Sequence, residues 1–340
     1  MENVAIHAIP LTILTGFLGA GKTTLLNRIL NGNHGLRVAV LVNDFGAINI
    51  DAGLVVGVEN DVISLSNGCV CCTVRDDLVE AVIEIINRPE APEYIILEAS
   101  GVSDPASIAM TFADEELQDR IRLDSVTCVL DADQVFAFPE YPDLMALKLR
   151  QIAFSDMIIL NKVELAGPVE VAKVRQWVNE NFRRLRIIET NQCDLPFEIL
   201  LSVGRYDAIN LDRIKQDSSQ RRCADSNCND KSHHHDHSKT FSTWSFETDQ
   251  PISLDELKEV ARKLPGNIYR AKGFVYSSED PYRRAVLQVV GRRVSITMDE
   301  KWNNQEPRTR IVAIGAPGTF HKNEFHELME SCIEKSLILN

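Results

Sequence analysis

The sequence lacks any apolar run that approaches the roughly 18 residues needed to span a membrane, and it is short of basic side chains. Its 36 Lys and Arg stand against 49 Asp and Glu, which gives a formal net charge of -13. That sign opposes attraction to nucleic-acid phosphates or to anionic lipid, so we expect neither nucleic acid nor a membrane as a partner. Glu2 stands where a signal peptide would be basic, and we therefore expect a cytoplasmic protein.

A disulfide framework is not expected either, because the cytoplasm keeps thiols reduced. Nevertheless, 3 of the 8 cysteines lie within the run Cys-Val-Cys-Cys at 69–72. Clustering of this kind in a reduced protein indicates metal binding or thiol chemistry.

The first 200 or so of the 340 residues alternate apolar strand-like runs with amphipathic helical stretches. This is the pattern of βαβ units and a parallel sheet. Strands are expected at 11–15, 38–42, 94–97, 125–130 and 157–160, and helices at 22–30, 74–86, 144–152 and 169–182. Thr73 is the expected N-cap of the second helix.

A polar stretch then separates this part from a second alternating pattern. Residues between Lys215 and Lys239 carry almost no apolar side chains, which indicates a linker. Beyond it, strands are expected at 240–246, 268–276, 285–290 and 310–314, and helices at 254–264 and 325–337. The predicted organisation is a domain at 1–211, a linker at 212–240 and a smaller α+β domain at 241–340.

The run Gly16-Phe-Leu-Gly-Ala-Gly-Lys-Thr23 matches the phosphate-binding motif G-x-x-x-x-G-K-[ST], between a predicted strand and a predicted helix. Backbone N–H groups of such a loop face phosphate oxygens, the lysine adds a positive charge, and the threonine hydroxyl can ligate Mg²⁺. The alternative is a plain glycine-rich turn. We predict a P-loop NTPase fold, α/β with a mostly parallel sheet flanked by helices. The residues expected to hold the nucleotide here are Gly16, Gly19, Ala20, Gly21, Lys22, Thr23 and Thr24.

Acidic residues that follow two other strands are candidates for a magnesium site. Glu98 closes a predicted strand, where the acidic metal ligand of such sites lies, and Gly101 after it is a candidate switch at the third phosphate. Asp44 and Asp51 are further candidates. For each acid the alternative is a solvated surface carboxylate. With the lysine and the first threonine of the P-loop, Glu98 is the predicted catalytic group.

The segment Asn161-Lys162-Val-Glu164 resembles the Asn-Lys-x-Asp motif with which GTPases read their base. The acid of that motif accepts hydrogen bonds from the guanine N1–H and N2–H₂ groups, a pair that adenine does not offer. Here the acid is Glu164, one methylene longer than Asp. The alternative is a polar cluster at the start of a helix.

The cysteine run at 69–72 lies at the start of a predicted helix, whose partial positive charge favours thiolate. Thiolate sulfur suits Zn²⁺ or Cu⁺, and with added N or O ligands Co²⁺. Cys69, Cys71 and Cys72 leave at least one coordination position open, as in a site that hands its metal on. The alternative is small cysteines packed in a tight turn. The isolated cysteines are interpreted as packing residues: Cys128, Cys193 and Cys332.

A histidine run in the predicted linker is the second metal-binding feature. Neighbouring imidazoles and one carboxylate can share a metal ion in a flexible loop, with two nearby cysteines as helpers. The alternative is a solvated linker. The residues concerned are His233, His234, His235, Asp236, His237, Cys223 and Cys228.

Together these motifs resemble the CobW-type metal-chaperone GTPases. The resemblance comes from the P-loop, Asn43-Asp-Phe-Gly, Gly68-Cys-Val-Cys-Cys, Glu98-Ala-Ser-Gly-Val-Ser-Asp-Pro and the later Asn-Lys pair. Segments 270–274 and 308–315 are similar to the C-terminal domain of that family. Two departures stand out: Glu164 in place of Asp, and Ala47 where many relatives have a Glu.

The resemblance implies a slow GTPase that uses GTP and Mg²⁺ and binds Zn²⁺, or in some relatives Co²⁺, at the cysteine run. It would transfer this metal to a client metalloprotein or to an enzyme of a metal-cofactor pathway, and a homodimer is compatible with it. We expect GTP to order segments 43–51 and 98–105 and thereby to change the metal site. Two rivals remain: a P-loop kinase or transferase with structural cysteines, and a zinc buffer or sensor that uses the histidine run.

Overall fold

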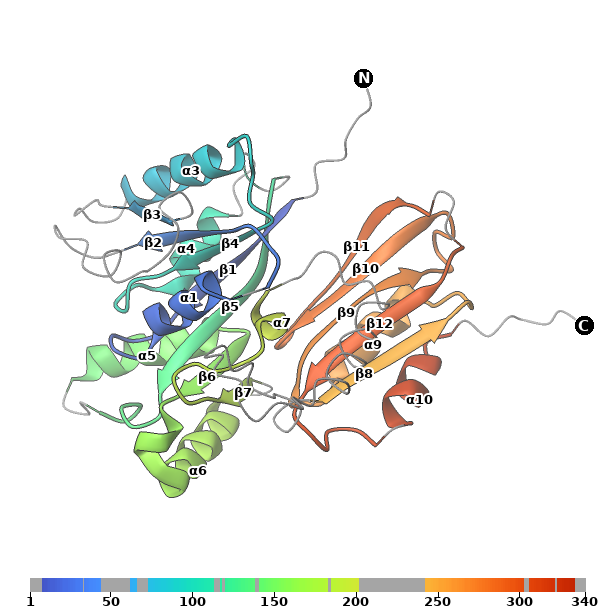
Figure 1. The fold of residues 1–340 in the computed structure, drawn as a ribbon. Coiled ribbons are helices and arrows are strands. Elements are labelled where there is room, and N and C mark those ends of the chain that lie inside the picture. The colour runs from blue at the N-terminus through green and yellow to red at the C-terminus, as the bar shows by residue number, and fades with distance from the viewer. Residues whose placement is uncertain are drawn as a thin grey trace, which may run out of the picture. The chain divides into compact units, whose positions relative to one another are not determined.

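The structure, a computed structural model, divides into two compact units, residues 1–202 and 203–340. It describes residues 8–32, 34–43, 62–65, 73–112, 117, 120–137, 141–182, 185–201, 242–302, 306–321 and 323–333. Each unit is described by itself (Figure 1).

The first unit is built on a seven-stranded sheet in which every described pairing is parallel. The strand order is β3-β2-β4-β1-β5-β6-β7. Its strands are β1 (Ile9–Thr15), β2 (Val38–Asn43), β3 (Val62–Leu65), β4 (Tyr94–Glu98), β5 (Ile121–Asp131), β6 (Met157–Asn161) and β7 (Arg186–Glu189). Its helices are α1 (Lys22–Leu30), α3 (Thr73–Ile86), α4 (Pro105–Thr111), α5 (Pro142–Phe154), α6 (Val163–Asn181) and α7 (Phe197–Leu200).

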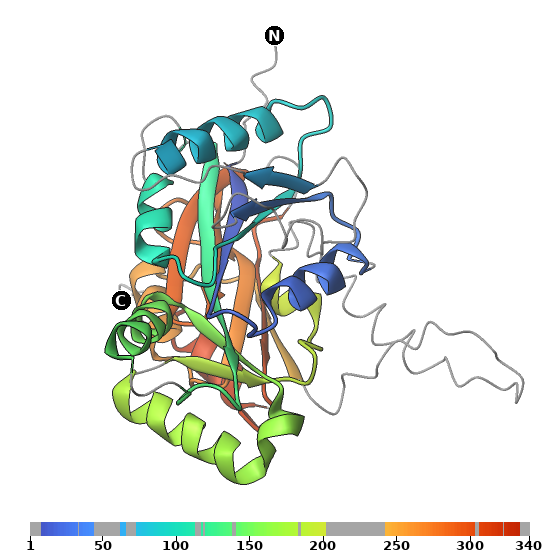
Figure 2. The same ribbon diagram turned by 90° about the vertical axis from the view of Figure 1, so that its left-hand side faces the viewer.

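Helices cover both faces of this sheet, which explains why its strands are apolar on both sides. In Figure 2, α1 and α7 lie on one side of the sheet and α3, α4 and α5 on the other. Buried leucine, isoleucine and valine side chains of α3 pack on β1, β2 and β4, and those of α6 pack on β5 and β6. The predicted α/β fold is therefore confirmed.

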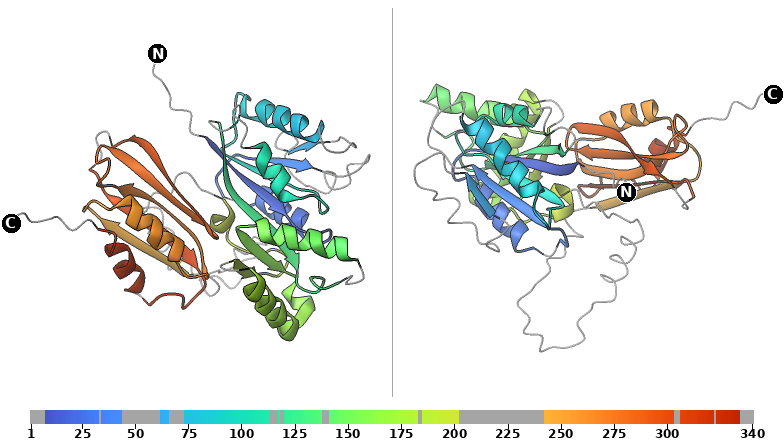
Figure 3. Two further views of the ribbon diagram at one scale, coloured as in Figure 1. Left: turned by 180° about the vertical axis from the view of Figure 1, so that it is seen from behind. Right: turned by 90° about the horizontal axis from the view of Figure 1, so that it is seen from above.

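The second unit is a five-stranded sheet in the order β11-β10-β9-β12-β8, antiparallel throughout its described pairings. Helices α9 and α10 cover one of its faces, where they share a single apolar cluster with the strands (Figure 3). The elements are β8 (Ser242–Thr248), α9 (Leu254–Lys263), β9 (Ile268–Tyr276), β10 (Arg283–Val290), β11 (Arg293–Lys301), β12 (Thr309–Gly315) and α10 (Glu324–Glu330). This is the smaller α+β unit that the sequence predicts.

Several boundaries differ from the prediction. Helix α10 ends at Glu330 rather than continuing to 337, because Ile333 forms a β-bridge with Ile252 and the Cys332 carbonyl accepts the Ser253 N–H. Helix α3 begins at Thr73 itself instead of after it. Helix α6 starts six residues earlier than expected, with a break at Gly167. Strands β3, β7 and β11 and helices α4 and α7 were not predicted at all. The domain limits at 211 and 241 fall on residues outside the described ranges.

No helix in the described ranges is long and apolar enough to cross a membrane.

A buried polar network ties the first unit together at the amino-terminal ends of its central strands. The Tyr94 hydroxyl lies 2.7 Å from Thr12 Oγ1 and donates its proton to Asp124 Oδ2 at 2.8 Å, with the Leu200 carbonyl oxygen at 3.0 Å. Thr12 Oγ1 also lies 2.8 Å from Ser125 Oγ. Tyr94 is fully buried. Its hydroxyl therefore links β1, β4 and β5 to α7.

Replacing Tyr94→Phe should lower the free energy of unfolding by about 1 to 3 kcal/mol, because the buried Asp124 carboxylate, the Thr12 hydroxyl and the Leu200 carbonyl lose their polar contact with the Tyr94 hydroxyl. Urea unfolding followed by circular dichroism measures this. Tyr282→Phe is the matched control, since the Tyr282 side chain is 79% exposed and its loss of a hydroxyl should change stability by less than about 0.5 kcal/mol. Equal stability of the two variants would contradict a structural role for the network.

Candidate functional site

The loop between β1 and α1 is too closely packed for side chains at two of its glycines. Gly16, Gly19 and Gly21 have φ angles of 134°, 75° and 113°. A Cβ on Gly16 would overlap the Val129 carbonyl oxygen, and one on Gly21 would overlap the Asn161 amide. Positive φ and close contact together require glycine at both positions. The loop backbone therefore curls at the N-terminus of α1 as a phosphate-binding loop does.

Lys22 is the first residue of α1 and is buried within this loop. Its ammonium group donates to the carbonyl oxygen of Gly16 at 3.0 Å and to that of Phe17 at 3.4 Å. The loop thus holds one positive charge at its centre, where the motif predicts contact with the outer phosphates.

Thr23 and Glu98 come together from elements far apart in the sequence. The Thr23 hydroxyl donates to Glu98 Oε1 at 3.3 Å, and Glu98 is buried at the carboxyl end of β4. The strand register places Glu98 beside Leu14 of β1, two residues before Gly16 of the loop. A hydroxyl and a carboxylate are hard oxygen ligands, so this pair fits Mg²⁺.

The Asn161 side chain connects three segments at the end of β6. Its amide nitrogen donates to the Ala20 carbonyl oxygen at 3.0 Å, and its amide oxygen accepts from the Cys193 N–H at 2.8 Å and from the Thr190 hydroxyl at 3.3 Å. It is buried. Asn161 therefore fixes the phosphate loop relative to the segment that follows β7.

That segment, residues 190–194, is a part of the site that the sequence analysis missed. Gln192 and Cys193 both have positive φ angles, 50° and 55°, and the Cys193 thiol contacts the Gly21 carbonyl oxygen at 3.5 Å. Arg28 of α1 holds the same turn, donating to the Gln192 carbonyl oxygen at 2.7 Å and to Asp194 Oδ1 at 3.1 Å. The sequence feature that could have predicted this segment is the short apolar pair Ile187-Ile188, which indicates a strand, followed by a polar cluster.

Cys193 is buried as predicted, but its surroundings are not simply apolar packing. Burial raises the pKa of its thiol to about 12, so the group stays neutral against the Gly21 carbonyl. Cys128 and Cys332 are likewise buried, and burial raises the pKa of both thiols. The packing interpretation of these two residues is confirmed.

The remaining residues predicted to contact the base lie at the start of α6. Lys162 has a positive φ of 62° and pairs with Asp131 of β5, with 2.7 Å between Nζ and Oδ2. Glu164 is exposed in the first turn of the helix. Asn161, Lys162 and Glu164 thus share the edge of the sheet with the phosphate loop, while Thr24 lies exposed on α1.

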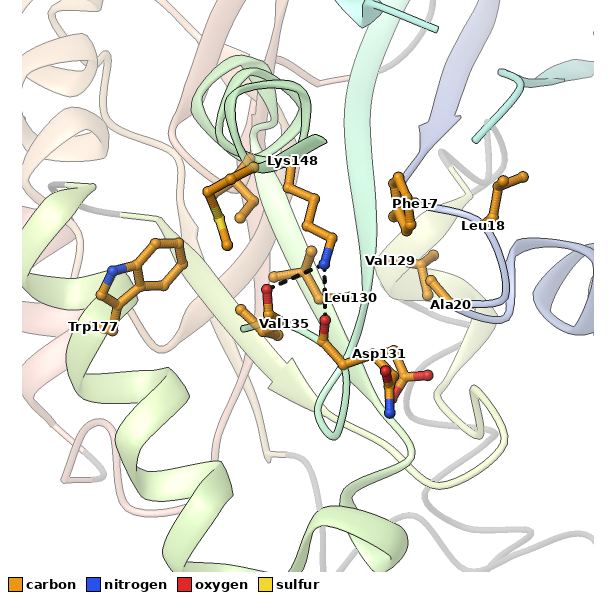
Figure 4. A pocket seen from close by; sticks show the side chains of 12 residues that line it. Phe17, Leu18, Ala20, Val129, Leu130, Asp131, Val135, Lys148 and Trp177 are labelled. Carbon is orange, nitrogen blue, oxygen red and sulfur yellow. Dashed lines mark hydrogen bonds between the residues drawn. The ribbon is translucent and has the colours of Figure 1, made fainter. Parts of the chain in front are cut away.

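A pocket of about 380 Å3, its open mouth included, lies between the phosphate loop and helices α5 and α6 (Figure 4). Phe17 and Leu18 of the loop line it together with Met145 of α5 and Trp177 of α6, and Lys148 points into it. The lining is mostly apolar, so this pocket does not itself suit a phosphate group.

Most of the predicted metal ligands lie outside the described residues. Among the residues that the structure does describe, no group of three or more His, Cys, Asp or Glu side chains could hold a metal ion. The residues outside the described ranges are Cys69, Cys71, Cys72, Asp44, Asp51, Ala47, His233, His234, His235, Asp236, His237, Cys223 and Cys228.

The chain matches two known domain families. Residues 10–189 match the CobW/HypB/UreG nucleotide-binding domain. Residues 241–333 match the cobalamin synthesis protein cobW C-terminal domain. The two matches correspond to the parallel-sheet unit and to the antiparallel-sheet unit.

Three curated relatives are similar over most of this chain. The zinc chaperone CobW of Pseudomonas aeruginosa is 31% identical over 347 residues, 90% of this chain and 87% of the relative. The zinc chaperone CobW of a Sinorhizobium species is 29% identical over 338 residues, 90% of this chain and 92% of the relative. The zinc-regulated GTPase metalloprotein activator 1 of Dictyostelium discoideum is 29% identical over 336 residues, which are 86% of this chain and 68% of the relative.

Replacing Asn161→Ala should weaken nucleotide binding about tenfold or more, because the phosphate loop and segment 190–194 lose the side chain that hydrogen-bonds to both. Titration with a fluorescent nucleotide measures this. Asn181→Ala is the control, since the Asn181 amide donates to the Trp177 carbonyl oxygen at the end of its own helix, α6. Unchanged affinity in the Asn161 variant would remove this residue from the binding site.

Proposed function

The chain belongs to the CobW/HypB/UreG family of nucleotide-binding proteins, and from this premise we propose that it is a GTP-hydrolysing metallochaperone for zinc. The observation that carries the proposal is the assembly of a phosphate loop, the Thr23–Glu98 pair and Asn161 at one edge of a parallel sheet. Ligands of open α/β sheets bind at the carboxyl ends of the strands, where this assembly lies.

Each group of this assembly has a role in the proposed reaction. The loop N–H groups from Gly16 to Thr24 and the Lys22 ammonium would hold the phosphates and offset the charge that develops during phosphoryl transfer. Thr23 and Glu98 would hold Mg²⁺, which supplies Lewis-acid stabilisation of the phosphate oxygens when bound. Among the described residues we identify no group that positions the attacking water.

The proposed base is guanine. Asn161 shapes the base site by holding segment 190–194, and Lys162 and Glu164 follow it along the chain. Glu164 replaces the shorter Asp of the usual motif and is exposed in the first turn of α6. A site that hydrogen-bonds the guanine N–H groups discriminates against adenine, which lacks them.

The proposed cargo is Zn²⁺, with Co²⁺ as the alternative metal. Two relatives are named zinc chaperones, and the chain carries the thiols of Cys69, Cys71 and Cys72 in one short run. Thiolates bind either metal, and the histidine run around Asp236 is a proposed auxiliary site. A client metalloprotein, or an enzyme of a metal-cofactor pathway, would receive the metal.

GTP and metal should bind with coupled affinities. In the presence of Mg²⁺ and a non-hydrolysable GTP analogue, Zn²⁺ should bind about tenfold tighter than with GDP or without nucleotide, a coupling of ~1.4 kcal/mol that Cys71→Ser removes. Competition with a chromophoric chelator, with Zn²⁺ and Co²⁺ in parallel, measures this.

Deletion of residues 232–238 is the control, since it removes the histidine run and leaves the cysteine run intact. A zinc buffer that works through the histidines would lose its affinity in this variant. Identical Zn²⁺ affinity in all three nucleotide states would overturn the chaperone proposal and favour a kinase or a buffering protein.

Replacing Glu98→Gln should lower Mg²⁺-dependent GTP hydrolysis about tenfold or more, because the metal loses a charged ligand. Release of inorganic phosphate measures the rate. Glu189→Gln is a matched control: this residue also ends a parallel strand, β7, but is exposed and pairs with Arg175. A wild-type rate in the Glu98 variant would place the metal ligand elsewhere.

A further inference from the structure

Gln151 is a buried amide on α5 that binds the backbone of another segment. Its side-chain nitrogen donates to the carbonyl oxygens of Gly101 at 3.1 Å and of Ser103 at 3.2 Å. The side chain is fully buried. Since both partners can only accept, the orientation of the amide is fixed by chemistry.

The segment to which Gln151 binds follows Glu98, the proposed Mg²⁺ ligand, and passes beside the phosphate loop. Ser103 N–H donates to the Ser100 carbonyl oxygen at 3.0 Å, which closes a turn directly after Glu98 and Ala99. Gly101 in this turn lies so close to the phosphate loop that a Cβ on it would be 2.7 Å from the Leu18 backbone nitrogen. Segment 101–103 therefore lies between α5 and the loop.

The same helix also contacts the phosphate loop itself. Lys148 lies one turn before Gln151, and its ammonium group is 4.9 Å from the centre of the Phe17 ring. It donates to the carbonyl oxygens of Gln134 at 2.9 Å and Ala137 at 3.2 Å. Helix α5 thus provides one platform against which both the loop and segment 101–103 are positioned.

The fold alone does not explain a glutamine at this position. Gln151 Oε1 is buried and has no hydrogen-bond partner among the described residues, and leaving a buried acceptor unsatisfied is destabilising. An apolar side chain of similar shape would avoid that cost. The amide is therefore useful for its two donated bonds, which fix the position of segment 101–103.

We propose that Gln151 is a positioning residue for the third phosphate of the nucleotide. By holding segment 101–103 against the phosphate loop, it would place backbone groups beside the third phosphate, since a loop of this motif surrounds the first two phosphates. A segment ordered in advance binds without a further loss of conformational entropy. This inference rests on the proposed GTP-binding function and specifies how the same site distinguishes GTP from GDP.

The test compares two nucleotides on the full-length protein. Gln151→Leu should weaken a non-hydrolysable GTP analogue about tenfold in the presence of Mg²⁺ while changing GDP affinity less than twofold. Gln151→Glu should weaken the analogue further, because its carboxylate would face two carbonyl oxygens. Isothermal titration gives both affinities.

Arg150→Met is the matched control. Arg150 is the neighbouring residue on α5 and reaches the next residue of the turn, Asp104, through an exposed ion pair of 3.7 Å. Exposed pairs contribute little, so the ratio of the two nucleotide affinities should stay within twofold of wild type. Gln151→Met, which keeps the length of the side chain, replaces Gln151→Leu if thermal melting shows that the latter is unfolded.

Two different failures are distinguishable. Wild-type protein that binds neither nucleotide overturns the proposed GTPase function. If the wild-type protein binds both nucleotides, the proposed function stands. The positioning role is then overturned if the Gln151 variants lose affinity equally for both nucleotides, or for neither of them.

Discussion

The Asn161 side-chain amide is the interaction on which the arrangement of the site depends. It is buried at the end of β6 and hydrogen-bonds to the Ala20 carbonyl oxygen, the Cys193 N–H and the Thr190 hydroxyl. The close approach needs Gly21, whose Cβ would overlap the amide. The Asn161 side chain therefore requires a glycine at position 21 of the phosphate loop. It also fixes the position of segment 190–194 after β7, because this segment hydrogen-bonds to the same amide.

Parallel strand order explains how residues far apart in sequence reach this edge. Glu98 ends β4 beside Leu14 of β1, and Asn161 ends β6 beside Asp131 of β5. Each of these strands runs in the same direction, so their polar ends converge on the loop after β1. In the second unit the described strands are antiparallel, so their carboxyl ends do not meet at one edge of the sheet. The described residues of the candidate site all belong to the first unit.

The sequence predicted those parts of the site that follow strongly apolar, buried strands. The phosphate loop and Glu98 were identified because a motif and a strand coincide there. Segment 190–194 was missed because β7 is only four residues long and Cys193 suggested packing alone. Gln151 had a signal that was not used: with Lys148 it puts two polar residues on the face of α5 that also carries buried Leu147 and Ile152. The cysteine and histidine runs lie outside the described residues, so their roles stay proposals.

The strength of the contacts around Gln151 suits a segment that is ordered before its ligand binds. A neutral buried hydrogen bond contributes about 0.5 to 1.5 kcal/mol net, so the two bonds to Gly101 and Ser103 amount to a few kcal/mol at most. Coupling between two binding sites is typically about 1 to 3 kcal/mol. Contacts of that size are enough to keep the segment in one place before a nucleotide binds, and thereby to change the affinity for the nucleotide. A fully apolar contact at the same place would hold the segment without fixing its register against the Leu18 backbone, since apolar packing is not directional.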